Sequence, residues 1–515
     1  MRRFGWPALL PYTLAALSGL LYFLAFPPLG WAPLGWVALV PLLVAVRRVG
    51  SWRGALLCGF VAAAVMSAFG YAWMADMAHR FWKVSWPLAA LMVLAYSTFG
   101  EINFALFAGS TRLLGSHLAR WPAVVTGGLF ASLELVTPKI FPDALGYTQI
   151  DMPALPAASA LVGTRGLTFI LAWFAACLAW YPVRAEVSRR RRRLELLLCV
   201  GFAAALTVYG ALHRRSVDAQ PIERQLEVVI IQNNIGDAGV FLDDAGDMGR
   251  MADTVVAQNV ALTQEALLGG SADLFVWPET AVPVSPRDLS FEPVRALTRT
   301  LGAPLILGGY DFQLTEKRTW RIFNAFYWLD RDGLVRGRYY KNKLLPLGEH
   351  VPFSEQFPVL LDWIPNAGLF SPGPGPTSLQ VGDLSITPFI CYEVLFPGYV
   401  RRGVRQGGNL LVNLTNDYWF GKYAEPEQHL ALARMRAYET ARPIVRATNT
   451  GVSAFIDANA RVVARTDLWQ PAILRATLDL PLAPSTPYLR WGEWLFVALM
   501  ASAWATTTLL WKLVP

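Results

Sequence analysis

Charged residues are scarce in this 515-residue sequence: Asp, Glu, Lys and Arg make up 16% of it, whereas 54% is hydrophobic. A soluble globular domain typically has roughly 25% charged residues. This shortage excludes an ordinary soluble protein, because much of the folded surface must face something other than water.

Cysteine is also sparse, with 4 in the whole chain. Cys58, Cys177 and Cys199 lie in apolar segments, where cysteine usually behaves as a small hydrophobic residue. Cys391 is the only cysteine in the polar part of the chain, and no CxxC spacing accompanies it. The pattern excludes a disulfide framework and a cysteine zinc site, and we expect neither a metal nor a cofactor.

The sequence lacks any nucleic-acid-binding motif or basic stripe, although its formal net charge is +8. It therefore predicts no nucleic-acid partner. The arginines instead form short clusters between apolar runs, a pattern that sets the orientation of membrane proteins.

Long apolar runs are abundant, and many approach the roughly 20 residues that cross a bilayer as a helix. They predict a polytopic α-helical membrane bundle with about eight spans. No small-residue cleavage site follows the first run, so we expect a retained span and not a signal peptide. The predicted spans lie near residues 8–26, 31–46, 54–75, 84–111, 121–137, 166–183, 194–212 and 491–511.

Basic residues lie before the first predicted span and after every second span that follows. They are Arg2, Arg3, Arg47, Arg48, Arg53, Arg112, Arg120, Arg184 and Arg189–Arg193. The positive-inside rule then predicts that both termini are cytoplasmic and that the long polar segment lies on the outer face. We expect an N-terminal bundle of about seven spans at 1–212, an extramembrane domain at 213–486 and a C-terminal transmembrane helix at 487–515.

Three polar residues fall inside the predicted spans, namely Glu101, Asn103 and Glu134. A carboxylate at membrane depth is costly and usually faces a bundle interior or a wet cavity. Hydrogen bonding between helices and a place along the substrate path are equally good interpretations from the sequence.

The extramembrane segment alternates short β-rich runs with amphipathic helices, which predicts an α/β domain. The predicted strands are Leu226–Asn233, Leu274–Trp277, Pro304–Gly309, Phe323–Leu329, Leu384–Ile390, Asn409–Asn413 and Ser453–Asp457. The predicted helices lie near residues 250–268, 291–301 and 426–441.

Three short segments place ionisable residues where an apolar strand ends, the usual location of reactive groups in α/β folds. They are LFVWPET with Glu279, YYKNKLLPLGEHVP with Lys341, Lys343 and Glu349, and ITPFICYEVLFPG with Cys391, Tyr392 and Glu393. The third segment has the pattern of a nucleophile elbow, in which a helix follows the strand. We expect the N-terminus of that helix to lower the thiol pKa of Cys391.

Taken singly, each segment also has a structural interpretation. Cys391 could be a small core residue, Glu279 a turn residue, and Lys341 with Lys343 a solvated basic face. The combination favours catalysis, because a thiol, an amine and a carboxylate can form a base-assisted nucleophile with cationic support for an oxyanion.

These segments resemble the Glu-Lys-Cys signature of the nitrilase (carbon–nitrogen hydrolase) superfamily. With the flanking spans, the chain closely resembles the apolipoprotein N-acyltransferase family, and NLTNDYWFG at 413–421 and RAYETARPIVRATNTGVS at 436–453 extend the likeness. The resemblance implies a nitrilase-like αββα sandwich for the extramembrane domain.

The resemblance also implies roles for individual residues. Glu279 matches the general base, Lys341 the family lysine and Cys391 the nucleophile, with Lys343 as the alternative lysine. The residues that match supporting positions are Glu349, Tyr392 and Glu393.

The implied reaction moves an acyl chain from a phospholipid, through a thioester, to the N-terminal amine of the diacylglyceryl-cysteine of an apolipoprotein. The implied location is the bacterial inner membrane, with the catalytic domain on the periplasmic side. One alternative is a membrane-anchored amidase that hydrolyses a small amide, although a single span would suffice to anchor it. A transporter is a further alternative, but the paired broken helices expected of one are not evident in the sequence.

Overall fold

The computed structural model describes residues 6–115, 123–180, 187–236 and 245–513, with gaps at 315, 317–319, 355, 360, 362–369 and 483. The chain divides into two compact units. The α/β unit is Val217–Ser485, and the helical unit comprises the segments before and after it. The residues of the orientation argument that lie outside the described residues are Arg2, Arg3, Arg120 and Arg184.

The described residues of the helical unit consist mainly of apolar helices. Its α-helices are α1 (Trp6–Ala25), α2 (Ala32–Gly35), α3 (Val40–Arg48), α4 (Trp52–Gly70), α5 (Trp73–Phe81), α6 (Trp86–Phe99), α7 (Ile102–Leu113), α9 (Ala123–Val136), α10 (Ser159–Trp180), α17 (Pro487–Trp491) and α18 (Trp494–Leu513). The 3-10 helices η1 (Leu145–Gln149) and η2 (Leu155–Ala158) precede α10. The long helix α11 (Arg189–Asp218) ends at the start of the α/β unit.

Three helices among the described residues are long and apolar enough to cross a membrane, and the bent pair α6 and α7 makes a fourth if it is one span. The three are Trp52–Gly70, Leu155–Trp180 and Arg189–Asp218. Leu9–Ala25, Ala123–Val136 and Trp494–Leu510 are apolar but shorter. The segment predicted as a span near 31–46 forms two short helices, α2 and α3, each with a proline in its first turn. A total of about eight spans therefore stays a prediction.

Buried ion pairs explain two of the polar residues predicted inside the spans. Lys139 Nζ lies 2.8 Å from Glu101 Oε2 and 2.5 Å from Asp143 Oδ1. Arg165 Nη1 lies 3.1 Å from Glu134 Oε2. Because each carboxylate has a cationic partner, the contacts favour the structural interpretation of Glu101 and Glu134.

The described residues of the α/β unit form twelve strands in two sheets. The strands are β1 (Ile222–Gln232), β2 (Leu274–Val276), β3 (Leu305–Leu314), β4 (Trp320–Leu329), β5 (Val335–Tyr340), β6 (Leu379–Val381), β7 (Leu384–Ile390), β8 (Leu410–Thr415), β9 (Ile444–Thr448), β10 (Ala454–Ile456), β11 (Val462–Arg465) and β12 (Ala472–Pro481). The helices are α12 (Ala245–Leu267), η3 (Leu289–Phe291), α13 (Glu292–Leu301), η4 (Cys391–Leu395), α15 (Pro397–Val404), η5 (Asp417–Phe420) and α16 (Glu425–Thr440).

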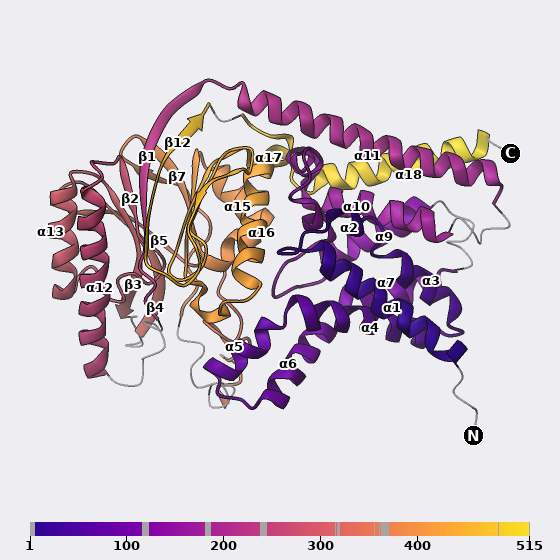
Figure 1. Cartoon of the computed structure of the whole chain (residues 1–515), viewed down its shortest axis with the longest axis horizontal. Helices are drawn as coiled ribbons and strands as arrows, with labels where there is room; N and C mark the ends of the chain where they lie inside the picture. Colours follow the sequence, from indigo (N-terminus) through magenta and orange to yellow (C-terminus); the bar gives the residue numbers. More distant parts are fainter. Residues whose placement is uncertain are drawn as a thin grey trace. The chain divides into compact units, whose positions relative to one another are not determined.

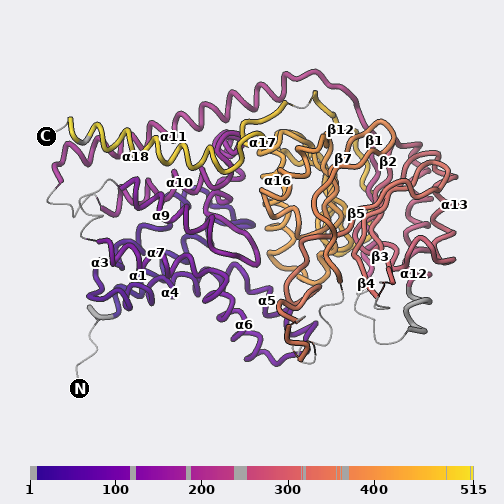
Figure 2. Tube along the Cα trace, turned by 180° about the vertical axis from the view of Figure 1, so that it is seen from behind, coloured from indigo at the N-terminus to yellow at the C-terminus, as the bar shows by residue number. Residues whose placement is uncertain are grey.

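Both sheets have parallel strands at the centre and antiparallel strands at the edges. The first sheet has the order β12-β1-β2-β3-β4-β5 and is parallel from β1 to β3. The second has the order β11-β10-β9-β8-β7-β6 and is parallel from β7 to β9. Helices α12 and α13 cover the outer face of the first sheet, and α15 and α16 cover that of the second (Figure 1). The view from behind shows the same four layers (Figure 2), which agree with the predicted αββα sandwich.

The core beneath α12 and α13 explains why these segments fold as they do. Trp277 is fully buried there with Phe275 and Leu305, and its indole N–H donates to Thr263 Oγ1 at 2.9 Å. Helix α13 ends at Gly302, whose φ of 61° is the left-handed conformation that favours glycine at a helix end. This packing fixes the carboxyl end of β2, from which the first site residue extends.

Candidate active site

The predicted catalytic residues follow three different strands. Glu279 lies three residues after β2, and Lys341 directly follows β5, so both come from the first sheet. Cys391 directly follows β7 of the second sheet. The site therefore forms between the facing sheets, where parallel strands of each reach their carboxyl ends.

Lys341 is held between two carboxylates. Its Nζ lies 3.1 Å from Glu279 Oε1 and 2.8 Å from Glu349 Oε1, and the lysine side chain is 2% exposed. Burial acts to lower the pKa of Lys341, but Glu279 and Glu349 outweigh it and raise the pKa well above its ordinary value. The side chain is therefore an ammonium ion that can stabilise negative charge on a substrate.

Glu279 is held at both carboxylate oxygens. Oε1 accepts hydrogen bonds from Lys341 and from Asn324 Nδ2 at 2.7 Å, while Oε2 accepts from the backbone N–H of Asn416 at 2.7 Å. The last contact joins the two sheets through the site. Burial raises the pKa of Glu279, against the opposing effect of the Lys341 ammonium. A carboxylate with a raised pKa is a stronger base, as general-base catalysis requires.

Cys391 has an unusual backbone conformation, with φ of +49°. Non-glycine residues rarely adopt this left-handed region, which turns the chain sharply as β7 ends. The segment that follows is the five-residue 3-10 helix η4, and α15 begins only at Pro397. The strand and sharp turn of a nucleophile elbow are present, but the α-helix expected directly after Cys391 is not.

The expected lowering of the Cys391 pKa was also wrong. Burial raises the pKa of the thiol well above its ordinary value, and the Glu279 carboxylate adds to the rise, while Lys341 opposes it. The thiol is therefore protonated in the resting site and requires a base. Glu279 is the carboxylate with the chemistry to be that base.

Asn324 on β4 is a site residue that the sequence analysis missed. Its Nδ2 donates to Glu279 Oε1 at 2.7 Å and to Glu349 Oε1 at 3.0 Å, so one amide holds both carboxylates. The other oxygen of Glu349 accepts from the backbone N–H of Leu345 at 2.9 Å. Asn324 lies on β4, WRIFNAFYWL, and from Ile322 to the end of that strand it is the one residue that is neither apolar nor aromatic, which was the available signal.

Glu393 accepts hydrogen bonds mainly from backbone N–H groups. The described contacts do not join it to the side chains of Glu279, Lys341 or Cys391. It accepts from the N–H groups of Asn342 at 2.7 Å, Lys343 at 3.0 Å and Ile390 at 2.9 Å, and from the Tyr339 hydroxyl at 2.7 Å. These bonds tie the turn after β5 to the end of β7. Glu393 thereby fixes Lys341 and Cys391 relative to one another through the backbone.

The two other predicted residues have different surroundings. Tyr392 is 5% exposed and its ring packs edge-on against Phe396, with 4.8 Å between ring centroids. Lys343, the alternative lysine, is exposed, and its ammonium lies over the Phe396 ring at 5.7 Å from the centroid. The geometry brings Lys341, and not Lys343, to the carboxylates.

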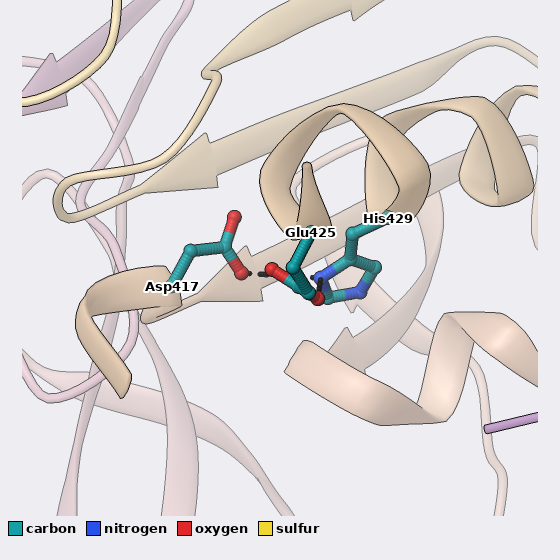
Figure 3. A group of neighbouring side chains, drawn as sticks. All are labelled: Asp417, Glu425 and His429. Atoms are coloured by element: carbon teal, nitrogen blue, oxygen red, sulfur yellow. Dashed lines mark hydrogen bonds and ion pairs between the residues drawn. The ribbon is translucent and has the colours of Figure 1, made fainter. Parts of the chain in front are cut away.

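A second group of buried ionisable side chains comprises Asp417, Glu425 and His429, on η5 and α16 (Figure 3). Their candidate ligand atoms all lie within 4.8 Å of one another, a spacing that a metal ion could occupy. Arg446 also reaches this group, with Nη2 at 2.9 Å from Asp417 Oδ2. Asp417 and Arg446 lie in the segments 413–421 and 436–453, where the sequence alone predicts no role for either residue.

Comparison with known proteins extends these observations. The carbon-nitrogen hydrolase family model matches residues 230–488, and the apolipoprotein N-acyltransferase N-terminal domain model matches residues 18–177. A crystal structure of a carbon-nitrogen hydrolase from Helicobacter pylori is 15% identical, covers 50% of this chain and 90% of its own, and superposes with a TM-score of 0.38.

Two relatives match over nearly the whole chain. The apolipoprotein N-acyltransferase of Bdellovibrio bacteriovorus is 31% identical over 94% of this chain and 91% of its own. That of Geobacter metallireducens is 31% identical over 96% of this chain and 94% of its own. The chain therefore belongs to the apolipoprotein N-acyltransferase family.

Proposed function

We propose that the protein transfers an acyl chain from a phospholipid to the N-terminal amine of a diacylglyceryl-cysteine on an apolipoprotein. The observation that carries the proposal is the buried ammonium of Lys341, held 3.1 Å from Glu279 and 2.8 Å from Glu349 at the site that also contains Cys391. The names of the full-length relatives supply the substrate class.

In the first half-reaction, Glu279 takes the proton of the Cys391 thiol as the sulfur attacks the ester carbonyl of the phospholipid. Negative charge then develops on the carbonyl oxygen. Lys341 and the backbone N–H of Tyr392 stabilise that oxyanion, an effect commonly worth about 3–4 kcal/mol for each donor. When the intermediate collapses, the ester C–O bond breaks, the lysophospholipid oxygen takes the proton from Glu279, and a thioester remains.

In the second half-reaction, the apolipoprotein amine attacks the thioester carbonyl. An α-amino group has an ordinary pKa of about 7.7–8.0, so part of it is neutral and nucleophilic near pH 7. Glu279 takes a proton from the attacking nitrogen, the C–S bond breaks, and the proton returns to the sulfur. The product is an amide, and the resting enzyme is restored in a ping-pong cycle.

The chain is membrane-associated, and we place it in the bacterial inner membrane with residues 213–486 on the periplasmic side. The support is the asymmetry of basic residues, since Arg47 and Arg48 lie in the last turn of α3 and Arg189–Arg193 begin α11. Helix α11 leads from its basic end to the α/β unit.

A pair of acceptors tests transfer against hydrolysis. The enzyme is incubated with a phospholipid labelled in its acyl chain, together with a diacylglyceryl-cysteine peptide that has either a free or an acetylated α-amine. We expect labelled amide only with the free amine. Labelled free fatty acid at equal rates with both peptides would instead identify a hydrolase and contradict the proposal.

A further inference from the structure

The backbone carbonyl of Cys391 is held by two buried side chains. Asn413 Nδ2 lies 3.3 Å from this oxygen, and His429 Nε2 also lies 3.3 Å from it. Asn413 is fully buried and His429 is 2% exposed, so water cannot replace either contact. Two side chains from different elements, β8 and α16, thus converge on one carbonyl.

This carbonyl belongs to the peptide that precedes Tyr392. A peptide unit is planar and trans, so its C=O and N–H point in opposite directions. Holding the Cys391 oxygen on one side therefore fixes the Tyr392 N–H on the other. Cys391 itself has a φ of +49°, a sparsely populated conformation that persists only where surrounding contacts impose it.

Arg446 orients both side chains that hold the carbonyl. Its Nη1 donates to Asn413 Oδ1 at 2.6 Å, which leaves the amide Nδ2 to face Cys391. Its Nη2 donates to Asp417 Oδ2 at 2.9 Å, and Asp417 Oδ1 lies 3.1 Å from His429 Nδ1. Arg446 is fully buried on β9, beside Asn413 in the parallel pairing of β8 and β9.

The contacts of His429 also determine how many protons this buried cluster must hold. Nε2 faces the Cys391 carbonyl, while Nδ1 faces Asp417 Oδ1 and, at 3.4 Å, Glu425 Oε1. A neutral imidazole has one N–H, yet Nε2 faces a carbonyl oxygen and Nδ1 faces two carboxyl groups, whose oxygens only accept when they are ionised. One further proton is therefore required, on His429 or on Glu425. Burial raises the pKa of Glu425 well above its ordinary value, and the Asp417 charge adds to the rise.

Charge balance favours a proton over a metal ion in this cluster. Asp417 and Arg446 neutralise one another, so one proton shared by Glu425 and His429 leaves the buried group neutral. A divalent cation in place of that proton would leave net positive charge among side chains that are at most 3% exposed. Arg446 also occupies one oxygen of Asp417.

We propose that His429 is a positioning residue that donates through Nε2 to the Cys391 carbonyl and, with Asn413 and the Arg446–Asp417 pair, fixes the Tyr392 N–H as an oxyanion donor. Glu425 and His429 share the proton that makes this donation possible. The proposal rests on the acyl-transfer mechanism above, since the Tyr392 N–H acts there on the developing oxyanion.

Two substitutions of His429 give a matched test. In His429→Gln the side-chain amide can reach the position of Nε2 and donate to the carbonyl, whereas the shorter side chain of His429→Asn cannot. The measurement is the rate of acyl-enzyme formation with a short-chain phospholipid, followed by intact-protein mass spectrometry, with thermal unfolding recorded for each variant. We expect His429→Asn to form acyl-enzyme at least about tenfold more slowly, with half-saturation by donor nearly unchanged.

His429→Gln should recover the rate to within about threefold of wild type. An unchanged rate in His429→Asn, or equal losses in both variants, would overturn the proposal. Absence of acyl-enzyme in the wild type would instead overturn the proposed function itself, so the two failures are distinguishable.

Glu425→Gln and Asp417→Asn separate the proton from a metal ion. A glutamine amide can donate to Nδ1 as a protonated Glu425 would, so we expect near-normal acylation in Glu425→Gln. Asp417→Asn leaves Arg446 as an unpaired buried cation and should lose most activity. Comparable losses in both variants, or one equivalent of tightly bound metal per chain by elemental analysis, would overturn the assignment in favour of a metal site.

Discussion

The ammonium nitrogen of Lys341 lies 3.1 Å from Oε1 of Glu279, and both side chains are at most 5% exposed. The ammonium opposes the rise in the Glu279 pKa that burial produces, and so favours the ionised carboxylate that the proposed base requires. In the proposed mechanism, the same ammonium stabilises the oxyanion once Glu279 has accepted the thiol proton.

Lys341→Met should lower the rate of acyl-enzyme formation by at least about a hundredfold, because a donor to the oxyanion is lost and two buried carboxylates lose their cation. Lys343→Met is the matched control, since that lysine is exposed and its ammonium lies over Phe396. We expect the control to stay within about twofold of wild type. Loss of activity in Lys343→Met with full activity in Lys341→Met would reverse the two assignments.

The rate of acylation should depend on pH through Glu279. The base must be ionised to accept the thiol proton, and burial raises its pKa above the ordinary value. Activity is therefore fully present above this raised pKa and lost as the pH falls through it, at a higher pH than for an ordinary glutamate. Single-turnover rates between pH 4 and pH 9 measure this limb. A flat profile down to the ordinary glutamate pKa of about 4.3 would contradict the assignment of Glu279 as base.

Glu393→Ala should destabilise the α/β unit and slow acylation together. The substitution leaves the backbone N–H groups of Asn342, Lys343 and Ile390 without their acceptor. An unsatisfied buried donor costs about 1–3 kcal/mol, so the loss should exceed that of one hydrogen bond. Thermal unfolding in detergent is the measurement, with Glu223→Gln as an exposed control. Equal unfolding temperatures for the two variants would show that Glu393 does not anchor the turn.

Sequence reasoning identified strands that are short apolar runs with turn residues on either side. Leu384–Ile390 was predicted with its observed bounds, because it is an apolar run bounded by turn residues. Strand β5 was missed because VRGRYY contains two arginines and a glycine, and β12 because its residues are only partly buried at the edge of the sheet. An edge strand forms mainly because it pairs with a neighbouring strand, so its own residue pattern is a weak predictor of it.

Candidate site residues could be proposed from the sequence where a residue has a distinctive local context. Glu279, Lys341 and Cys391 each follow a strand in a recognisable segment, and the structure pairs Lys341 with Glu279 and brings both close enough to Cys391 to affect its pKa. Asn324 and His429 have no such context, because each acts through a contact with a residue far away in the sequence. Only tertiary packing reveals them. The raised thiol pKa of Cys391 likewise depends on burial that the sequence does not show.

The most direct test of the account is to find the acyl group on Cys391. A variant with alanine at Cys58, Cys177 and Cys199 keeps Cys391 as its sole thiol and serves as the reference. After incubation with phospholipid and no acceptor, intact-protein mass spectrometry should show one added acyl chain that hydroxylamine removes. The same protein with Cys391→Ala should show none, and addition of a diacylglyceryl-cysteine peptide should discharge the acyl group as amide. An acyl adduct that persists in Cys391→Ala, or amide formation by that variant at the reference rate, would contradict the central claim.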